Sequence, residues 1–481
     1  GSRGANGVII IETKKGKVGR AVVSYTGTFG VQSVTKKIDM MSSYDYVKYL
    51  IERDESNYAT FLTNEGRTLD DYRNIRAIDW QDKTAFVHMH NVSLRGGNKM
   101  TRYAASASLS NQPGVIVNSG YKKYQGRVSL DQQISKAVKL SLNANYTQDK
   151  ISGQTSSAAL STSNSYATYL MYRTWAFRPV MLSHQNPDDL FDDDFDGSNS
   201  AVMNPYITTM NEDRHQKRST FIANAKLGIT LAKGLTLNIS GGYTSYNSRT
   251  TEFNNSESYK GYPRPNNSKN VNASVADYLR NDWMNENVLT YKRKYNNKHN
   301  FDVMVGFTMQ GTTTEKYGFE TTNIPDEGLG LSGMDDGLPY ATNVSLSENT
   351  LMSALVRVNY NYKSRYMFTT SFRADGSSKF MDGHRWGYFP SGAFAWKIDQ
   401  EPFMKDIEEP WLRMAGWINE AKLRVSVGMT GNNRVGDFSA YPSISMSDYY
   451  SIGNATPGEA YIPNNLGNRD LTWETTTQYN I

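Results

Sequence analysis

Apolar and polar residues alternate with a period of two along much of this chain. Such alternation predicts β-strands that have one apolar face and one polar face. The residues between the apolar positions are mainly small or polar, and they include Arg357 and Arg424, whose charges require a wet environment. In five segments the apolar positions are Leu140, Leu142, Ala144 and Tyr146; Leu235, Leu237 and Ile239; Phe301, Val303, Val305 and Phe307; Ala354, Val356, Val358, Tyr360 and Tyr362; and Leu423, Val425, Val427 and Met429. This pattern is typical of a barrel wall between lipid and an aqueous lumen.

Short connections alternate with long connections between these segments. The sequence predicts short turns near 96–100, 135–137, 232–234, 295–298 and 363–365, and longer stretches near 111–120, 150–216, 252–274 and 312–349. Outer-membrane barrels join their strands by short periplasmic turns and long extracellular loops, so this parity favours such a barrel. We count about fourteen strand-like segments, whereas a plugged transporter barrel closes with about 22 strands. We therefore expect further strands beyond Ile481 in the native protein.

Composition supports a polar, aromatic-rich β-protein. Hydrophobic residues make up 38% of the 481 residues, and no apolar run reaches the roughly 20 residues of a membrane-spanning helix. The 32 Tyr, 18 Phe and 8 Trp would supply aromatic girdles at the two membrane interfaces. Cysteine is absent, which excludes disulfides and thiol chemistry, and a net charge of +5 without a basic run argues against a nucleic-acid partner. We expect one short helix over 42–55, capped by Ser43, with Tyr46, Val47, Leu50 and Ile51 on one face.

Several separated motifs resemble the SusC/RagA-type TonB-dependent outer-membrane transporters. The opening GSRGANGVIIIETKKGK (1–17) resembles the end of the plug domain of that family. Stretches that resemble successive barrel hairpins are HNVSLRGGNKMTRYAASASLSNQPGV (90–115), FRADGSSKF with RWGYFPSGAFAWKI (372–398), LRVSVGMTGNNRVGD (423–437) and NRDLTWETTTQYNI (468–481). Together these motifs span almost the whole chain. The chain is therefore similar to a piece of such a transporter.

The resemblance implies an all-β fold, a transmembrane antiparallel β-barrel with a plug largely outside this chain. Residues 1–20 would be the end of the plug, and 21–481 an incomplete barrel with long extracellular loops at 150–216, 252–274, 312–349 and 431–469. It also implies import across the bacterial outer membrane, driven by the TonB complex, with a SusD-like lipoprotein as a lid. A dimer of such transporter–lipoprotein pairs is a further implication of the resemblance. The cargo would be oligosaccharides or, alternatively, oligopeptides. No cofactor is implied.

Two groups of residues are candidates for contact with ligand or lid. The aromatic side chains in the longest loop are Tyr169, Tyr172, Trp175 and Phe177, which could instead anchor that loop against the barrel rim. Arg373, Asp375 and Lys379 are predicted at a hairpin tip. They could contact ligand or form a network of ion pairs at the rim.

Other motifs have a structural explanation beside a functional one. Arg3, Gly4, Ala5, Asn6 and Gly7 could form a plug latch or a simple turn before a strand. Asp192, Asp194 and Asp196 open like a calcium loop, but the twelfth position is Met203 where a bidentate Glu is required. We favour a solvated acidic loop there, and we predict no metal site.

Two further patterns suggest enzyme chemistry only superficially. Gly328, Gly330 and Gly333 match a dinucleotide fingerprint by letter, but no strand-to-helix unit surrounds them. His88 and His90 would point the same way from one strand, yet a third metal ligand is missing, which favours an interfacial or lumen position. No nucleophile, base or acid pair stands out, so we do not expect an enzyme. A surface adhesin without transport is the remaining alternative class.

Overall fold

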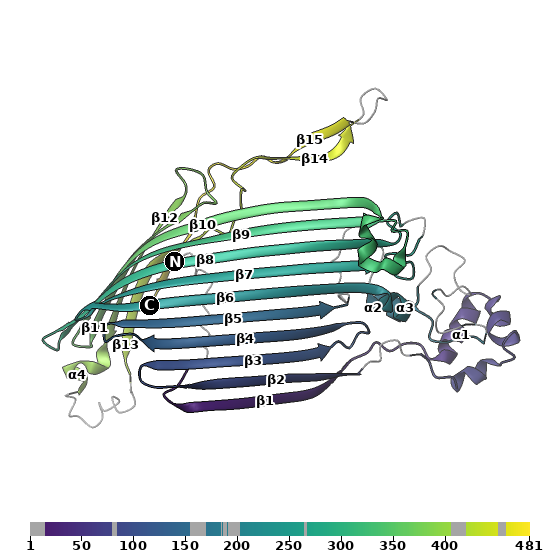
Figure 1. Ribbon diagram of the computed structural model, residues 1–481, viewed down its shortest axis with the longest axis horizontal. Helices are drawn as coiled ribbons and strands as arrows, with labels where there is room; N and C mark the ends of the chain where they lie inside the picture. Colours follow the sequence, from purple (N-terminus) through teal and green to yellow (C-terminus); the bar gives the residue numbers. More distant parts are fainter. Residues whose placement is uncertain are drawn as a thin grey trace.

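A computed structural model of the chain describes residues 15–78, 84–153, 170–183, 185, 190, 203–263, 267–405, 420–450 and 458–481. Fourteen strands in this described part form one antiparallel sheet in which neighbours in sequence are neighbours in space. Figure 1 shows the sheet as a wide, strongly curved wall. The strands are β1 (Gly19–Ser33), β2 (Thr84–Gly97), β3 (Thr101–Pro113), β4 (Gly120–Gln133), β5 (Val138–Ser152), β6 (Glu212–Ala232), β7 (Leu235–Asn254), β8 (Asn272–Tyr295), β9 (His299–Thr322), β10 (Leu338–Tyr362), β11 (Tyr366–Ser377), β12 (Trp386–Lys397), β13 (Lys422–Asn432) and β16 (Glu474–Asn480). The predicted all-β barrel wall with about fourteen strands is confirmed.

The predicted alternation of connection lengths is also confirmed, with two corrections to the loops. All five predicted short turns lie between the strands as expected, from β2–β3 to β10–β11. The loops predicted at 252–274 and 312–349 are shorter than expected, because β7 to β10 extend until 255–271 and 323–337 remain between them. Thr, Glu and Lys dominate the start of the β9 extension, but Tyr317 and Phe319 continue its outward stripe, and Leu338, Tyr340, Val344 and Leu346 alternate in the same way on β10. The alternation was therefore present in the sequence and was missed.

The long connections carry most of the helices. Figure 1 shows α1, α2 and α3 at one end of the sheet and α4 at the other. The helical elements are α1 (Ser43–Arg53), η1 (Ala59–Thr63), η2 (Leu69–Arg73), α2 (Leu170–Ala176), α3 (Pro205–Met210), η4 (Glu327–Asp335), η5 (Ile398–Gln400) and α4 (Pro402–Lys405). A separate hairpin of β14 (Ser443–Tyr450) and β15 (Gly458–Asn465) lies within the predicted loop 431–469. No helix in the described part of the chain has the length and apolarity that a membrane span needs.

A small lobe is built from the β1–β2 connection, which the sequence did not single out as a long loop. The predicted helix is present as α1, but its cap is Ser42 and not Ser43, because the Ser42 hydroxyl accepts a hydrogen bond from the Asp45 backbone N–H. Ser43 is itself buried. The lobe core consists of Val47, Leu50, Phe61, Leu62 and Tyr72 with Val180 and Leu182 from the β5–β6 connection. Two loops that are distant in sequence therefore share one core.

The outward face of the sheet carries the apolar stripes that the sequence predicted. Large apolar side chains on it are exposed in the isolated chain, as a surface that contacts lipid requires. Aromatic rings line the end with short turns, where Tyr362 stacks on Tyr366 with centroids 6.4 Å apart and Tyr366 stacks on Trp396 at the same distance. Glu401, in the connection below, accepts a hydrogen bond from the Trp396 indole and one from Arg365. This belt resembles the girdle at a membrane interface.

Candidate ligand-binding site on the inner wall

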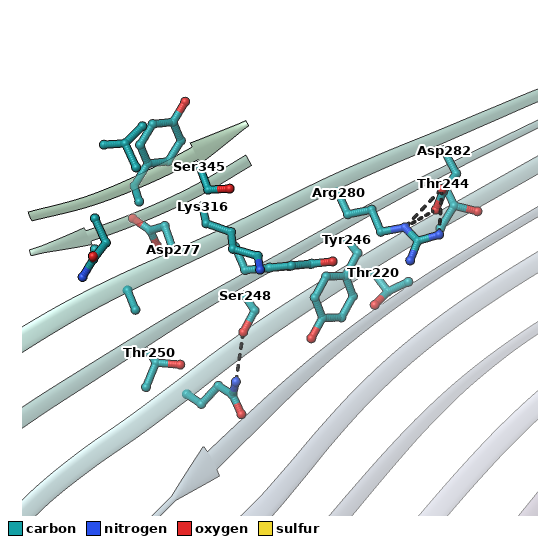
Figure 2. A pocket seen from close by; sticks show the side chains of 17 residues that line it. Thr220, Thr244, Tyr246, Ser248, Thr250, Asp277, Arg280, Asp282, Lys316 and Ser345 are labelled. Carbon is teal, nitrogen blue, oxygen red and sulfur yellow. Dashed lines mark hydrogen bonds and ion pairs between the residues drawn. The ribbon is translucent and has the colours of Figure 1, made fainter. Parts of the chain in front are cut away.

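The inner face of β6 to β10 bears a polar and aromatic pocket of about 930 Å³. Alternation places every second residue of each strand on this face, and the strand register aligns them in rows. One row runs through Thr220, Tyr246 and Arg280, and the next through Ser248, Tyr278, Lys316 and Ser345. Figure 2 labels Thr220, Tyr246, Ser248, Arg280, Lys316 and Ser345 among the side chains that line the pocket on neighbouring strands.

Two tyrosine rings form the aromatic part of the pocket. The rings of Tyr246 and Tyr278 are T-shaped, with centroids 5.6 Å apart and planes at 76°. The Lys316 ammonium lies 5.9 Å from the centroid of the Tyr278 ring. Rings that face a cavity offer flat apolar surfaces with a polar rim, which suits partly apolar ligands such as sugars and peptide side chains.

The Arg280 guanidinium beside the rings is already paired with a carboxylate. The Arg280 Nε lies 3.1 and 3.0 Å from the two carboxylate oxygens of Asp282, and the Thr312 hydroxyl donates to Asp282 at 2.6 Å. Gln216 donates to the Ser248 hydroxyl at 3.0 Å. The Arg280–Asp282 pair therefore presents a fixed set of donors and acceptors with no net charge, as Figure 2 shows.

Sequence reasoning did not identify this pocket. Its residues follow the polar stripe that begins with Thr236, Asn238 and Ser240, so continuing the same parity along β7 leads to Tyr246 and Ser248. That signal was available in the sequence. The grouping across five strands depends on register, which alternation alone does not fix.

Three of the four predicted aromatic residues, Tyr172, Trp175 and Phe177, lie in the described part of the β5–β6 connection. Tyr169 lies outside the described residues, and Tyr172 and Trp175 lie in α2. Phe177 is buried at 3% exposure, so it serves as a loop anchor and does not face solvent. Beside it, Arg173 forms a buried ion pair with Glu212 at 3.5 Å and lies 4.6 Å above the Tyr259 ring.

Arg373 and Asp375 also lie in packed structure and not at an open tip. They are on β11, where Arg373 Nε donates to Asp375 at 2.6 and 2.9 Å and Asp375 is completely buried. Lys379 pairs with Asp437 at 3.1 Å. These contacts agree with the alternative of an ion-pair network.

The network lies beside a buried cluster built from the motifs of the sequence analysis. Leu351, Phe380, Phe389 and Trp473 form its core. The Trp473 indole donates to the Arg385 carbonyl at 2.9 Å, across 88 residues of sequence. The motifs at 372–398, 423–437 and 468–481 thus meet at one place on the inner rim.

The remaining predicted sites give no metal or nucleotide chemistry in the described residues. Arg3, Gly4, Ala5, Asn6 and Gly7, like Asp192, Asp194 and Asp196, lie outside that part of the chain. No group of three potential metal ligands is present within it. Gly328, Gly330 and Gly333 lie in or beside η4, between two strands, and not at the start of an α-helix.

The two histidines lie on the outward face. His88 Nδ1 is 3.2 Å from His90 Nε2, and the Tyr25 hydroxyl is 2.8 Å from His90 Nδ1. Phe29 packs edge-on against His90 with ring centroids 5.4 Å apart. A lumen position is therefore excluded for this pair.

Comparison with known proteins gives relatives over the whole chain. The chain is 27% identical over 494 residues to "TonB-dependent receptor P39" of Formosa agariphila, and 28% identical over 508 residues to "TonB-dependent receptor SusC" of Bacteroides thetaiotaomicron. Each alignment covers 100% of this chain but 43% and 46% of the relative, so the chain spans less than half of these proteins. No family model matches the chain.

Solved structures with the same fold exist. The chain superimposes on "Structure of the RagAB peptide transporter" with a TM-score of 0.74 and 19% identity, covering 100% of this chain and 54% of that one. For the RagAB peptide importer in its 'open-open' state the TM-score is 0.76, the identity 20% and the coverage the same.

Proposed function

The chain is a homologue of the SusC-type TonB-dependent receptors, and from this premise we propose that it forms the wall of a channel that imports oligosaccharides. It is an outer-membrane β-barrel protein and not an enzyme. Its apolar outward face and polar inner face suit a wall between lipid and a watery passage. Import requires binding and release, with no covalent chemistry.

The assignment of an oligosaccharide as the cargo rests on the pair of tyrosine rings, Tyr246 and Tyr278. Sugar rings present apolar C–H faces, which stack on aromatic rings, and hydroxyl groups, which need donors and acceptors nearby. The rings lie in a wall that also offers hydroxyl groups and the paired Arg280 and Asp282. Aromatic faces beside hydroxyl groups fit a glycan, and the Lys316 ammonium would donate hydrogen bonds to its hydroxyl groups.

The start of the described chain supports the proposal that residues 1–20 are the end of a plug. Lys15 lines a pocket on the inner wall together with Ser24, Asn91 and Arg127. Gly16 lies so close to the Tyr103 backbone that a Cβ would come within 2.5 Å of the Tyr103 nitrogen. The chain therefore approaches β1 along the inner wall, as a segment that leaves a plug would.

The proposed partners follow from the relatives. We propose that the TonB complex supplies the work of transport and that a SusD-like lipoprotein covers the outer mouth, in a dimer of transporter–lipoprotein pairs. The helical lobe around α1 and the β14–β15 hairpin lie at the end of the long connections or within one of them, where such a lid would contact the chain.

Import of oligopeptides is the second candidate function. Arg280, Asp282 and Lys316 could pair with charged side chains or chain ends of a peptide, and the structural relative RagAB is described as a peptide transporter. A surface adhesin is a third candidate, and it would not need TonB.

Uptake measurements separate these candidates. Cells that lack the full-length gene should lose growth on one class of glycan and uptake of the labelled glycan, and cells that lack TonB should show the same loss. Loss of peptide uptake instead would favour the second candidate. Uptake that is unchanged in both strains would contradict an import function.

Variants test the pocket within the same assay. Replacing Tyr246 and Tyr278 by Ala should weaken glycan binding by roughly tenfold, because each stacking contact contributes about 0.5–1.5 kcal/mol. The matched control is Tyr243→Ala, since Tyr243 is on the same strand but points outward and contacts Asn281. Equal uptake by the pocket variant and the control would remove the pocket from the ligand path.

A further inference from the structure

Three lysine side chains form a row across the outward face of β4, β5 and β6. Lys122 is directly opposite Lys150, and Lys150 is directly opposite Lys217. All three are exposed. Side chains at directly opposite positions have Cβ atoms about 5 Å apart, and like charges placed in this way repel each other.

Among the described residues, no ion pair joins an acidic group to the row, and Asp213, four residues before Lys217, pairs with His215 at 2.8 Å. Asp149, next to Lys150 in sequence, points to the other face, where it contacts Tyr121 and Arg218. The next basic side chain along the row, Arg249, has its own carboxylate partner in Asp277 at 3.1 Å. Among the ion pairs of the described residues, none includes Lys122, Lys150 or Lys217. Within the described part of the chain, the row therefore holds three positive charges that no carboxylate pairs with.

The row lines a hollow of about 640 Å³ in the outward face. Asn111 and Ser152 also line it, together with His215 at the start of β6. These groups can donate and accept hydrogen bonds beside the ammonium groups. The hollow thus combines positive charge with neutral polar groups, which suits a phosphate attached to a sugar.

An apolar groove of about 500 Å³ lies on the same face, further from the long connections. A Cβ added at Gly126 would contact nothing within 4 Å, so the groove is open at that point. Gly126 is four residues from Lys122 along β4, which corresponds to about 13 Å. The side chains that surround the opening are Val92, Leu94, Ala105, Ala107, Val128, Ala144, Tyr146 and Phe221.

We propose that this part of the outer wall binds a phosphate-bearing, acylated glycolipid of the outer leaflet. Its phosphate groups would contact the lysine row, and an acyl chain would lie in the groove below. Lys122 is two residues from the start of β4 and Lys150 is two residues from the end of β5, so the row lies near the end of the sheet with the long connections. That end is extracellular in outer-membrane barrels, where the outer-leaflet headgroups lie. This inference concerns the lipid-facing side and does not depend on the imported cargo.

The dimensions favour a glycolipid over a phospholipid. The three lysines span two strand spacings, about 10 Å, which exceeds the reach of a single phosphate group. The sugar of a phosphoglycolipid would also use the amide of Asn111 and the hydroxyl of Ser152. A simple phospholipid has no sugar hydroxyl groups to satisfy these side chains.

The test measures lipid binding by the full-length protein in detergent, with native mass spectrometry and the lipid-induced rise in unfolding temperature. The probes are purified lipid A and phosphatidylethanolamine. Lipid A should bind and raise the unfolding temperature, while phosphatidylethanolamine should bind more weakly. Equal binding of the two lipids would overturn the assignment to a glycolipid.

The triple variant Lys122→Gln, Lys150→Gln and Lys217→Gln should lose roughly a hundredfold in affinity for lipid A. The matched control removes three charges from the inner face by Lys139→Gln, Lys226→Gln and Lys294→Gln and should bind like the wild type. Wild-type affinity in the lysine-row variant would overturn the proposal.

Two further readouts separate a ligand site from a structural role. Without lipid, the lysine-row variant should be at least as stable as the wild type, because like-charge repulsion has been removed. A destabilised variant would assign the lysines a structural role and overturn the proposal. Gly126→Trp should fill the groove and weaken lipid A binding, whereas unchanged binding would remove the groove from the site.

Discussion

The indole of Trp283 lies over Gly311, its direct cross-strand partner on β9, so closely that a Cβ at Gly311 would come within 2.5 Å of the indole Nε1. Trp386 and Gly376 repeat this arrangement between β12 and β11, with ring carbons 3.0 Å from the position of the missing Cβ. Both indoles are on the outward face and are nearly half exposed. Because glycine has no side chain, each indole ring lies close against the sheet at that position, where it can contact a membrane interface.

Gly311→Ala should lower the stability of the barrel by about 1–3 kcal/mol, because the added methyl group would overlap the Trp283 indole and displace it. The unfolding temperature in detergent, measured by the gel shift of heated samples, reports this change. Gly126→Ala is the control, since its added Cβ meets no neighbour. Equal unfolding temperatures of the two variants would show that Trp283 adapts without cost.

Arg173→Met should destabilise the packing of the β5–β6 connection by about 3–5 kcal/mol, because it leaves the buried Glu212 carboxylate without its partner. Limited proteolysis of this connection in detergent measures the effect. Arg249→Met breaks the more exposed pair with Asp277 and should cost at most about 1 kcal/mol. Similar cleavage rates for the two variants would contradict the importance of burial.

Acid should loosen the contact that ties the β13–β16 connection to β10. Partial burial alone would raise the pKa of Asp437, but hydrogen bonds from Ser347, Lys379 and Asn349 outweigh it and hold the pKa below its usual 3.8. A depressed pKa in the folded state means that the contact stabilises above pH 3.8 and is lost as the pH falls through the lower value. The protection factors of residues 433–442, which correct hydrogen exchange for the intrinsic rate at each pH, should therefore fall only below about pH 4.

Asp437→Asn provides the comparison for this pH dependence. The variant should exchange faster than the wild type already at neutral pH, and it should lose the acid-dependent step. A wild-type protein whose protection factors already fall between pH 7 and 5 would contradict the assignment to Asp437.

Trp473→Ala should destabilise the inner-rim cluster by about 3–5 kcal/mol, because it leaves a cavity beside Phe380 and Phe389. Denaturant unfolding of the detergent-solubilised protein measures this loss. Tyr441→Ala, at an exposed position of the same connection, should stay within about 0.5 kcal/mol of the wild type. Equal free energies of unfolding for Trp473→Ala and Tyr441→Ala would show that the cluster does not stabilise the rim.

Sequence patterns were sufficient for the wall because a strand's faces are a local property. The stripe from Phe301 to Phe307 alternates along a single segment, so its outward direction follows from the pleat alone. Turn positions such as 295–298 were predictable because the alternation of apolar and polar residues is interrupted there between two strands. The extension of β9 beyond Gly311 was missed because Thr, Glu and Lys fill its first five positions, although Tyr317 and Phe319 then resume the outward stripe.

The candidate binding residues were less predictable from the sequence, because the burial of a side chain depends on which distant segments of the chain pack against it. Phe177 and Asp375 were candidates for contact with ligand, with loop packing and a rim ion-pair network as the alternatives, and both side chains are buried. The pocket around Tyr246 and the lysine row need the alignment of three or more strands, and a shift of one residue in any register would separate them.

The sequence by itself determined a polar-inside, apolar-outside β-wall with short and long connections, since period two and turn residues act within a few positions. Only the tertiary structure decided which polar residues share the inner pocket, how Trp473 reaches Arg385, and that Lys122, Lys150 and Lys217 form one row. The physical reason is that side-chain contacts between strands depend on register and loop packing, which join residues far apart in the chain.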